Sequence, residues 1–109
     1  MICPKNIELN EYVNIAYSND VYLSFLFCSN DYFKSTETYS YMLETPDFYK
    51  CFSTYNYLMI YQLDGWIFTN FLDYYINLNV DYIGSPWKAY ILNLDEDTIG
   101  NGGVSLRKV

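Results

Sequence analysis

The sequence predicts an α/β domain built on a mainly parallel sheet. Three observations support this class: a continuous apolar run at residues 55–63, apolar residues at helical spacing over residues 70–78, and a short second run at Val80–Ile83. A continuous apolar run is typical of a strand buried on both faces of a parallel sheet. Because a strand, a helix and a strand in succession form a crossover, Tyr57–Leu63 and Val80–Ile83 are predicted to be parallel neighbours.

The first half of the chain carries weaker signals. Residues 1–20 are polar and irregular, and they indicate only a short strand at Tyr12–Tyr17. The β-branched and aromatic run Val21–Cys28 predicts a buried strand that ends in a turn. A helix is predicted to begin after Thr45, whose side chain can cap the free amides, with Pro46 at the first helical position.

The end of the chain is rich in glycine, with three glycines in the segment Gly100–Gly103. This segment is predicted to be a turn that leads into a short strand at Val104–Leu106, where bare backbone can come close to a ligand. A three-layer α/β domain usually has about 100–200 residues. Since the predicted elements stop without a closing helix, the 109-residue chain is expected to be truncated at its C-terminus.

Charge and composition exclude several classes of function. The net charge is −7, with only six Lys and Arg residues, so a basic surface for nucleic acid is not expected. The absence of histidine excludes every mechanism that uses a histidine base or ligand. No apolar stretch is long enough to cross a membrane, and a secretory leader is not expected, because the N-terminus has polar residues where its apolar region would be. With three widely spaced cysteines, these features predict a cytoplasmic protein.

A carboxylate follows the clearest predicted strand. Asp64 lies at its carboxyl end, where open α/β sheets bind their ligands, and Gln62 lies on the same strand face. Asp64 is then a ligand for a metal or a ribose, or else simply a turn residue before Gly65. Trp66 follows the acidic turn and Trp87 follows a proline, and each indole either walls a sugar pocket or packs under a loop.

Four blocks of this sequence together resemble a family of largely uncharacterised proteins assigned to the A-type glycosyltransferase fold. They occur in the family's order and cover the last two thirds of the chain. Their joint occurrence is specific, although each block alone is not. The four blocks are Asp47-Phe48-Tyr49, Tyr61-Gln62-Leu63-Asp64-Gly65-Trp66-Ile67-Phe68, Asp81-Tyr82-Ile83-Gly84-Ser85-Pro86-Trp87 and Gly100-Asn101-Gly102-Gly103-Val104-Ser105-Leu106-Arg107.

The resemblance implies a partial three-layer fold that transfers a sugar from a nucleotide-sugar donor to a glycan or other hydroxyl acceptor. It also implies a divalent cation, Mn²⁺ or Mg²⁺, on Asp64, which keeps the one carboxylate of the family's usual pair. The glycine segment is similar to a galactosyltransferase motif that lines the sugar or acceptor pocket. The implied donor and substrate residues are Gln62, Asp64, Trp87, Asn101, Gly102 and Gly103; no catalytic residue is assigned.

The resemblance divides the chain into a poorly matched segment, residues 1–38, and a glycosyltransferase-like core, residues 39–109. Two other functions stay open from the sequence. One is a catalytically inactive remnant that still binds a nucleotide-sugar or a glycan. The other is a small structural or interaction domain whose exposed sheet edges recruit a partner.

Overall fold

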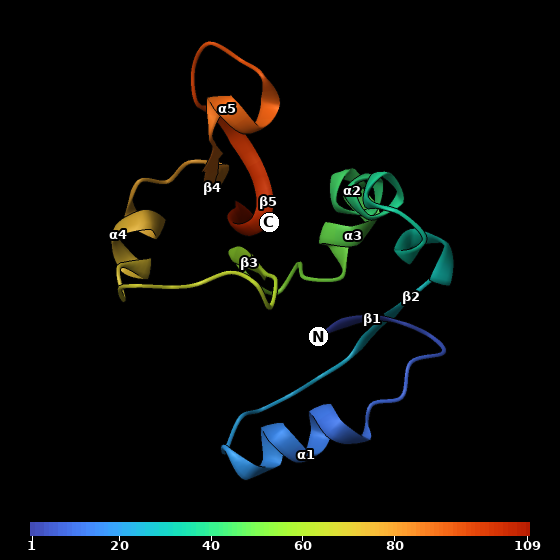
Figure 1. The fold of residues 1–109 in the computed structure, drawn as a ribbon. Coiled ribbons are helices and arrows are strands. Elements are labelled where there is room, and N and C mark those ends of the chain that lie inside the picture. Colours follow the sequence, from blue (N-terminus) through green and yellow to red (C-terminus); the bar gives the residue numbers. More distant parts are fainter. The chain divides into compact units, whose positions relative to one another are not determined.

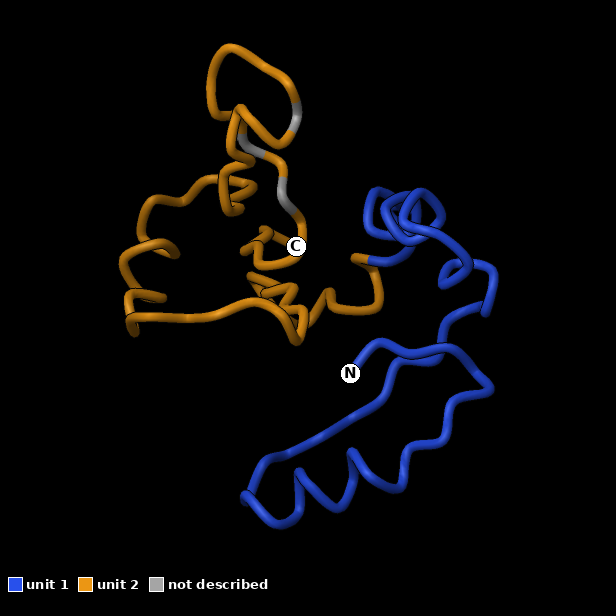
Figure 2. Tube along the Cα trace, in the orientation of Figure 1, with its two compact units in different colours: residues 1–48 blue, residues 49–109 orange. Residues whose placement is uncertain are grey.

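The computed structural model describes residues 1–91, 93–98, 100 and 102–109, and it contains both helices and strands (Figure 1). It confirms a mixed α/β chain. Two compact units make up the chain, Met1–Phe48 and Tyr49–Val109 (Figure 2). Each unit is considered by itself below.

The first unit contains two three-residue strands and several short helices. Strands β1 (Ile2–Pro4) and β2 (Leu26–Cys28) pair in parallel, with Cys3 opposite Phe27. Its other elements are α1 (Asn10–Ser18), the 3₁₀ helix η1 (Asn30–Phe33), α2 (Thr36–Glu44) and the start of α3 (Pro46–Lys50). The predicted helix start at Pro46 is confirmed.

Two strand predictions for this unit are wrong. Residues 12–17 lie in α1, because local bonds satisfy the backbone there without a partner strand: Asn19 Nδ2 donates to the Ile15 carbonyl at 2.8 Å, one turn earlier. Of Val21–Cys28 only the last three residues form a strand, since β1 offers three residues for pairing. Val21 and Tyr22 are exposed rather than buried.

Helix α2 begins at a capping box that the sequence analysis overlooked. Ser35 Oγ accepts from the Thr38 backbone N–H at 3.2 Å, and Thr38 Oγ1 accepts from the Ser35 N–H at 3.1 Å. Thr45 does not cap α3 with its side chain. Its hydroxyl donates back to the Met42 carbonyl of α2 at 2.8 Å, so it closes the preceding helix instead.

The second unit holds a three-stranded sheet in the order β3-β5-β4. The elements of this unit are β3 (Tyr57–Tyr61), α4 (Leu72–Asn77), β4 (Tyr82–Trp87), α5 (Ala89–Leu92) and β5 (Thr98–Lys108).

No helix in the described part of the chain has both the length and the apolar character needed to cross a bilayer.

The prediction of a mainly parallel sheet is wrong for this unit. The glycine-rich segment is part of β5, an eleven-residue strand that pairs antiparallel with both β3 and β4. Strands β3 and β4 therefore run in the same direction, but β5 lies between them and they are not neighbours. The predicted helix between them is confirmed as α4, and a bond from the Tyr57 hydroxyl to the Ile76 carbonyl (3.4 Å) joins it to β3.

Along strand β3 the two faces of the sheet differ in burial. Ile60 and Ser105, which are cross-strand partners, are 4% and 2% exposed. Met59 and Tyr61 point to the other face and are 38% and 49% exposed. Strand β3 is therefore not buried on both faces, contrary to what its continuous apolar run predicts.

Candidate functional site

A tight turn follows β3 and carries the predicted carboxylate. The Gln62 N–H donates to the Gly103 carbonyl of β5 at 2.8 Å, which extends the ladder by one residue. The Gly65 N–H then donates to the Gln62 carbonyl at 2.9 Å, and the Tyr61 hydroxyl donates to the Gly65 carbonyl at 2.9 Å. These three bonds fix the turn, with Asp64 at its third position.

Glycine is required at position 65 because the turn passes very close to β5. A Cβ atom on Gly65 would overlap Val104 Cγ2 and would stand 3.1 Å from the Gln62 carbonyl oxygen. The backbone of the turn at Gly65 therefore packs directly against the Val104 side chain of β5, and this contact holds Asp64 beside β5.

A small pocket lies between this turn and strands β4 and β5. Its volume is about 190 Å³ and its lining is almost entirely polar. We call it the polar pocket; the residues that line it are Gln62, Asp64, Gly65, Trp66, Ser85, Gly103 and Val104. Asp64 supplies a carboxylate, Gln62 an amide and Ser85 a hydroxyl, so the pocket can accept and donate hydrogen bonds and carries negative charge.

The structure brings some of the predicted site residues together. Gln62, Asp64 and Gly103 all line the polar pocket. Gly102 precedes Gly103 on β5 and is not among the lining residues. Trp87 lies farther along β4, paired with Thr98, and does not line the pocket either. Asn101 lies outside the described residues.

Ser85 is a hydrogen-bonding pocket residue that the sequence analysis missed. The predicted strand Val80–Ile83 ends before Ser85, whereas β4 extends from Tyr82 to Trp87. Register shifts on both sides of Ser85 mark an irregularity of the bulge type. Such irregularities turn a side chain out of the regular alternation and are frequent beside binding sites. A proline within a strand-like run, here Pro86, was the available signal.

A network of hydrogen bonds around Arg107 and Ser105 of β5 supports the glycine-rich part of that strand. Arg107 Nη1 donates to the Tyr49 hydroxyl at 2.8 Å and Arg107 Nε donates to Ser105 Oγ at 3.1 Å. Ser105 Oγ in turn donates to the Gly102 carbonyl at 3.3 Å. The guanidinium also stands over the Tyr82 ring, 5.4 Å from its centroid. Arg107 therefore steadies the strand that carries Gly103 and does not itself line the pocket.

Three acidic residues, Asp95–Asp97, precede β5, and one of them, Asp97, has a clear structural role. Asp97 accepts from Lys88 Nζ at 2.7 Å and from the Ala89 N–H at 2.8 Å. The hydrogen bond from Lys88 holds the pKa of the Asp97 carboxyl below its usual value, and the same bond raises the pKa of Lys88. Asp97 thus closes the loop between α5 and β5.

The polar pocket does not contain a complete protein ligand set for a metal. Among the residues that the structure describes, no three acidic, cysteine or histidine side chains gather in one place. Among the described residues that line the pocket, Asp64 is the one carboxylate. Mg²⁺ is commonly bound by one or two carboxylates together with substrate phosphates. The residues present therefore fit a cation that arrives with a phosphate-bearing ligand.

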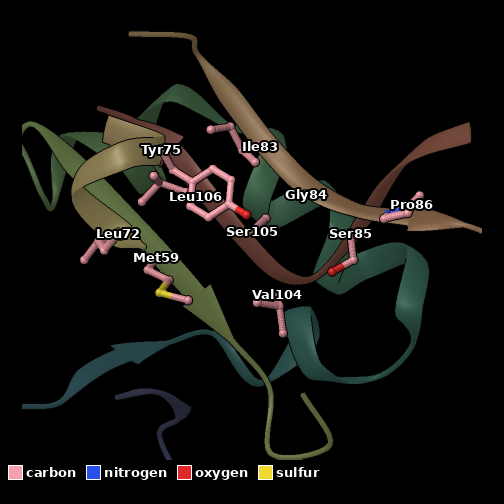
Figure 3. A pocket seen from close by; sticks show the side chains of 10 residues that line it. All are labelled: Met59, Leu72, Tyr75, Ile83, Gly84, Ser85, Pro86, Val104, Ser105 and Leu106. Carbon is pink, nitrogen blue, oxygen red and sulfur yellow. The ribbon is translucent and has the colours of Figure 1, made fainter. Parts of the chain in front are cut away.

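Two larger cavities lie over the sheet face that carries Met59, beneath α4. One has a volume of about 300 Å³ (Figure 3) and the other about 420 Å³. They share Met59, Leu72 and Tyr75, and both have mainly apolar linings. We call the two cavities together the apolar chamber.

The second unit thus combines a small polar pocket, at the end of β3 where a carboxylate meets a glycine-rich strand, with an apolar chamber on one sheet face. The chain belongs to a family of proteins of unknown function (DUF5672), whose model matches residues 22–109. Comparison with curated proteins and with solved structures gives no match.

Proposed function

We propose that this chain is the donor-binding part of a glycosyltransferase with an A-type glycosyltransferase fold. One observation carries the proposal. Gln62 and Asp64 come from one block of the resemblance described above and Gly103 comes from another, and the three line a single polar pocket. Because β3 and β4 run in the same direction, their carboxyl ends meet at this edge of the sheet, where α/β proteins hold their ligands.

The proposed reaction moves a sugar from a nucleotide diphosphate to an acceptor. The bond between the anomeric carbon and the diphosphate oxygen breaks, and the diphosphate leaves with the bonding electrons. The acceptor hydroxyl oxygen bonds to the carbon and releases its proton. In this scheme the Gln62 amide hydrogen-bonds and orients the sugar or diphosphate oxygens of the donor.

A divalent cation, Mn²⁺ or Mg²⁺, belongs to this proposal. When bound, it would neutralise charge on the diphosphate, and Asp64 would hold it together with the phosphate oxygens. At about 190 Å³, the polar pocket is smaller than the 300–1,000 Å³ typical of sites for whole ligands. It therefore suits one part of the donor, the diphosphate with its cation.

A cytoplasmic location belongs to the same proposal. It is based on the odd number and wide spacing of the cysteines, which fit a reducing compartment.

Ligand titration of the full 109-residue chain by heteronuclear NMR tests this function. We expect uridine or guanosine diphosphate sugars, in the presence of Mg²⁺, to shift the amide signals of residues 62–65 and of Gly103. Asp64→Asn should weaken this binding at least tenfold, because it removes the charge that holds the cation. Asp73→Asn is the matched control, since Asp73 is an exposed carboxylate on α4 outside the pocket lining.

Two results would count against the proposal. One is that no nucleotide-sugar shifts these amides, and the other is that binding is equally strong in Asp64→Asn. Binding without any sugar transfer would instead favour the inactive remnant that the sequence left open.

A further inference from the structure

The apolar chamber and the polar pocket adjoin each other. Ser85 and Val104 line both the polar pocket and the 300 Å³ cavity of the chamber. In Figure 3, Val104 and Ser85 come from the adjacent strands β5 and β4, and Met59, Leu72 and Tyr75 surround the rest of the cavity. A ligand in the polar pocket is therefore next to the opening of an apolar space.

The chamber has the lining expected for an uncharged, apolar group. No charged side chain is among the described residues that line either of its cavities. Several of the apolar side chains there are well exposed, among them Phe68 at 86% and Phe71 at 59%. A contiguous group of exposed apolar side chains around a cavity is typical of a site that a ligand covers.

The volumes also separate the two sites. Each cavity of the chamber, about 300 and 420 Å³, lies within the usual range for small-molecule sites, whereas the polar pocket does not. A sugar diphosphate is too polar and too strongly charged for the chamber, because a charge moved there would lose its hydration without a partner. The chamber is thus suited to a different part of the reaction's substrates from the polar pocket.

We propose that the chamber holds the apolar aglycone of an acceptor glycoside, and that the accepting sugar lies at the junction formed by Ser85 and Val104. This inference rests on the proposed glycosyltransferase function and names the substrate class of the same site. Ser85 is exposed at the junction, and no hydrogen bond joins its hydroxyl to another residue that the structure describes. It can therefore donate to, or accept from, a hydroxyl of the accepting sugar.

A pair of uncharged ligands tests the aglycone site in the full chain. Octyl β-glucoside, used below its micellar concentration, and methyl β-glucoside differ only in the apolar group. We expect octyl β-glucoside to bind at least tenfold more tightly, because burying two or more methylene groups already accounts for about this factor. Shifts of side-chain methyl signals of Met59, Leu72 and Leu106 in NMR spectra would locate the ligand.

Two pairs of variants test where the octyl group lies. Leu72→Gln should reduce the preference for octyl over methyl glucoside at least fivefold, and Leu78→Gln should leave it unchanged. Both leucines are at α4 with similar exposure, 42% and 48%, but only Leu72 lines the chamber. Tyr75→Ala and Tyr74→Ala form a second pair, in which only Tyr75 lines the chamber. Circular dichroism checks that each variant is folded.

The outcomes distinguish this inference from the proposed function. If nucleotide-sugars bind through Asp64 but octyl and methyl glucoside bind alike, the aglycone site is wrong and the proposed function stands. If octyl glucoside binds in the chamber but no nucleotide-sugar binds, the chamber is not an acceptor site and both proposals are wrong. If uridine displaces octyl glucoside, the chamber belongs to the nucleoside and the acceptor assignment is overturned. Donor and octyl glucoside binding together, each weakened only by its own variant, supports it.

Discussion

The two sheets of this chain form by different kinds of pairing. In the first unit, β1 and β2 pair in parallel over three residues, and the middle residue of β2, Phe27, is 48% exposed. In the second unit, β5 pairs antiparallel along both of its edges and buries Ile60 of β3 to 4% exposure. The apolar run in the sequence is strong in both cases, so apolarity alone does not decide how much of a run becomes a paired strand.

The partner strand makes the difference. In the described part of the chain, Val21–Cys28 pairs with Ile2–Pro4 over three residues, and most of the run is not part of a strand. Strand β5 contains three glycines and would be judged a poor strand by itself, but it has a strand on each side. Position between two strands outweighs the low intrinsic preference of glycine for strands.

The largest expected effect is the difference between a buried position of one sheet, Ile60, and a half-exposed position of the other, Phe27. Ile60→Ala should cost about 2–5 kcal/mol of the free energy of unfolding, because it opens a cavity at a buried position. Phe27→Ala should cost clearly less, since half of that side chain is already exposed. Urea denaturation followed by far-UV circular dichroism measures both. Equal losses would show that the two sheets do not differ in packing as described.

The next effect concerns the close approach of the turn to β5. Gly65→Ala should cost about 1–3 kcal/mol, because the new methyl group overlaps Val104 Cγ2. Adding Val104→Ala to this variant should recover part of the loss, since it removes the overlapping atom. Chemical denaturation of the single and double variants provides the test. A neutral Gly65→Ala would mean that the turn and the strand are farther apart.

A smaller effect is expected for the network that supports β5. Tyr49→Phe removes the acceptor of the Arg107 bond and should cost about 0.5–1.5 kcal/mol. Tyr55→Phe is the control, because the Tyr55 side chain is 65% exposed, and it should change stability by less than about 0.5 kcal/mol. Thermal unfolding of the two variants measures the difference. If Tyr55→Phe is the more damaging, the Arg107 network does not stabilise the sheet.

The smallest effect is the pH dependence of the loop between α5 and β5. Because the hydrogen bond from Lys88 holds the folded-state pKa of Asp97 below its ordinary value of 3.8, its contribution to stability is present above that value and is lost as the pH falls through the lowered pKa. A carboxyl titration by NMR should give a pKa for Asp97 below 3.8, and Lys88→Met should return it towards that value. An unchanged pKa in Lys88→Met would show that the ion pair does not persist in solution.

Much of the candidate site could be predicted because its signals are local. The run that ends in Gln62 and Asp64 fixes a strand and the turn after it, and the apolar spacing fixes α4. Gly103 could be joined to them only through the family resemblance, because its pairing with Gln62 is a contact between segments far apart in the chain.

The direction of the sheet and the role of Ser85 could not be predicted in this way. When a helix connects two strands, the strands can be parallel neighbours in the sheet. They can equally run in the same direction with a third, antiparallel strand from later in the chain between them, as β5 lies between β3 and β4. That choice depends on where β5 inserts, which no local pattern encodes. Ser85 enters the pocket through the irregular register of β4, and a regular alternation of side chains gives no sign of it.

The irregular strand has a consequence for association between molecules. In the described part of the second unit, β3 and β4 are the outer strands of the sheet, and each has an edge on which another strand can be added. Pro86 lacks an N–H and sits beside register shifts, so the free edge of β4 is a poor template for a strand from elsewhere. The free edge of β3 carries five regular residues without proline. Sheet extension, and the risk of aggregation that comes with it, is therefore concentrated on β3.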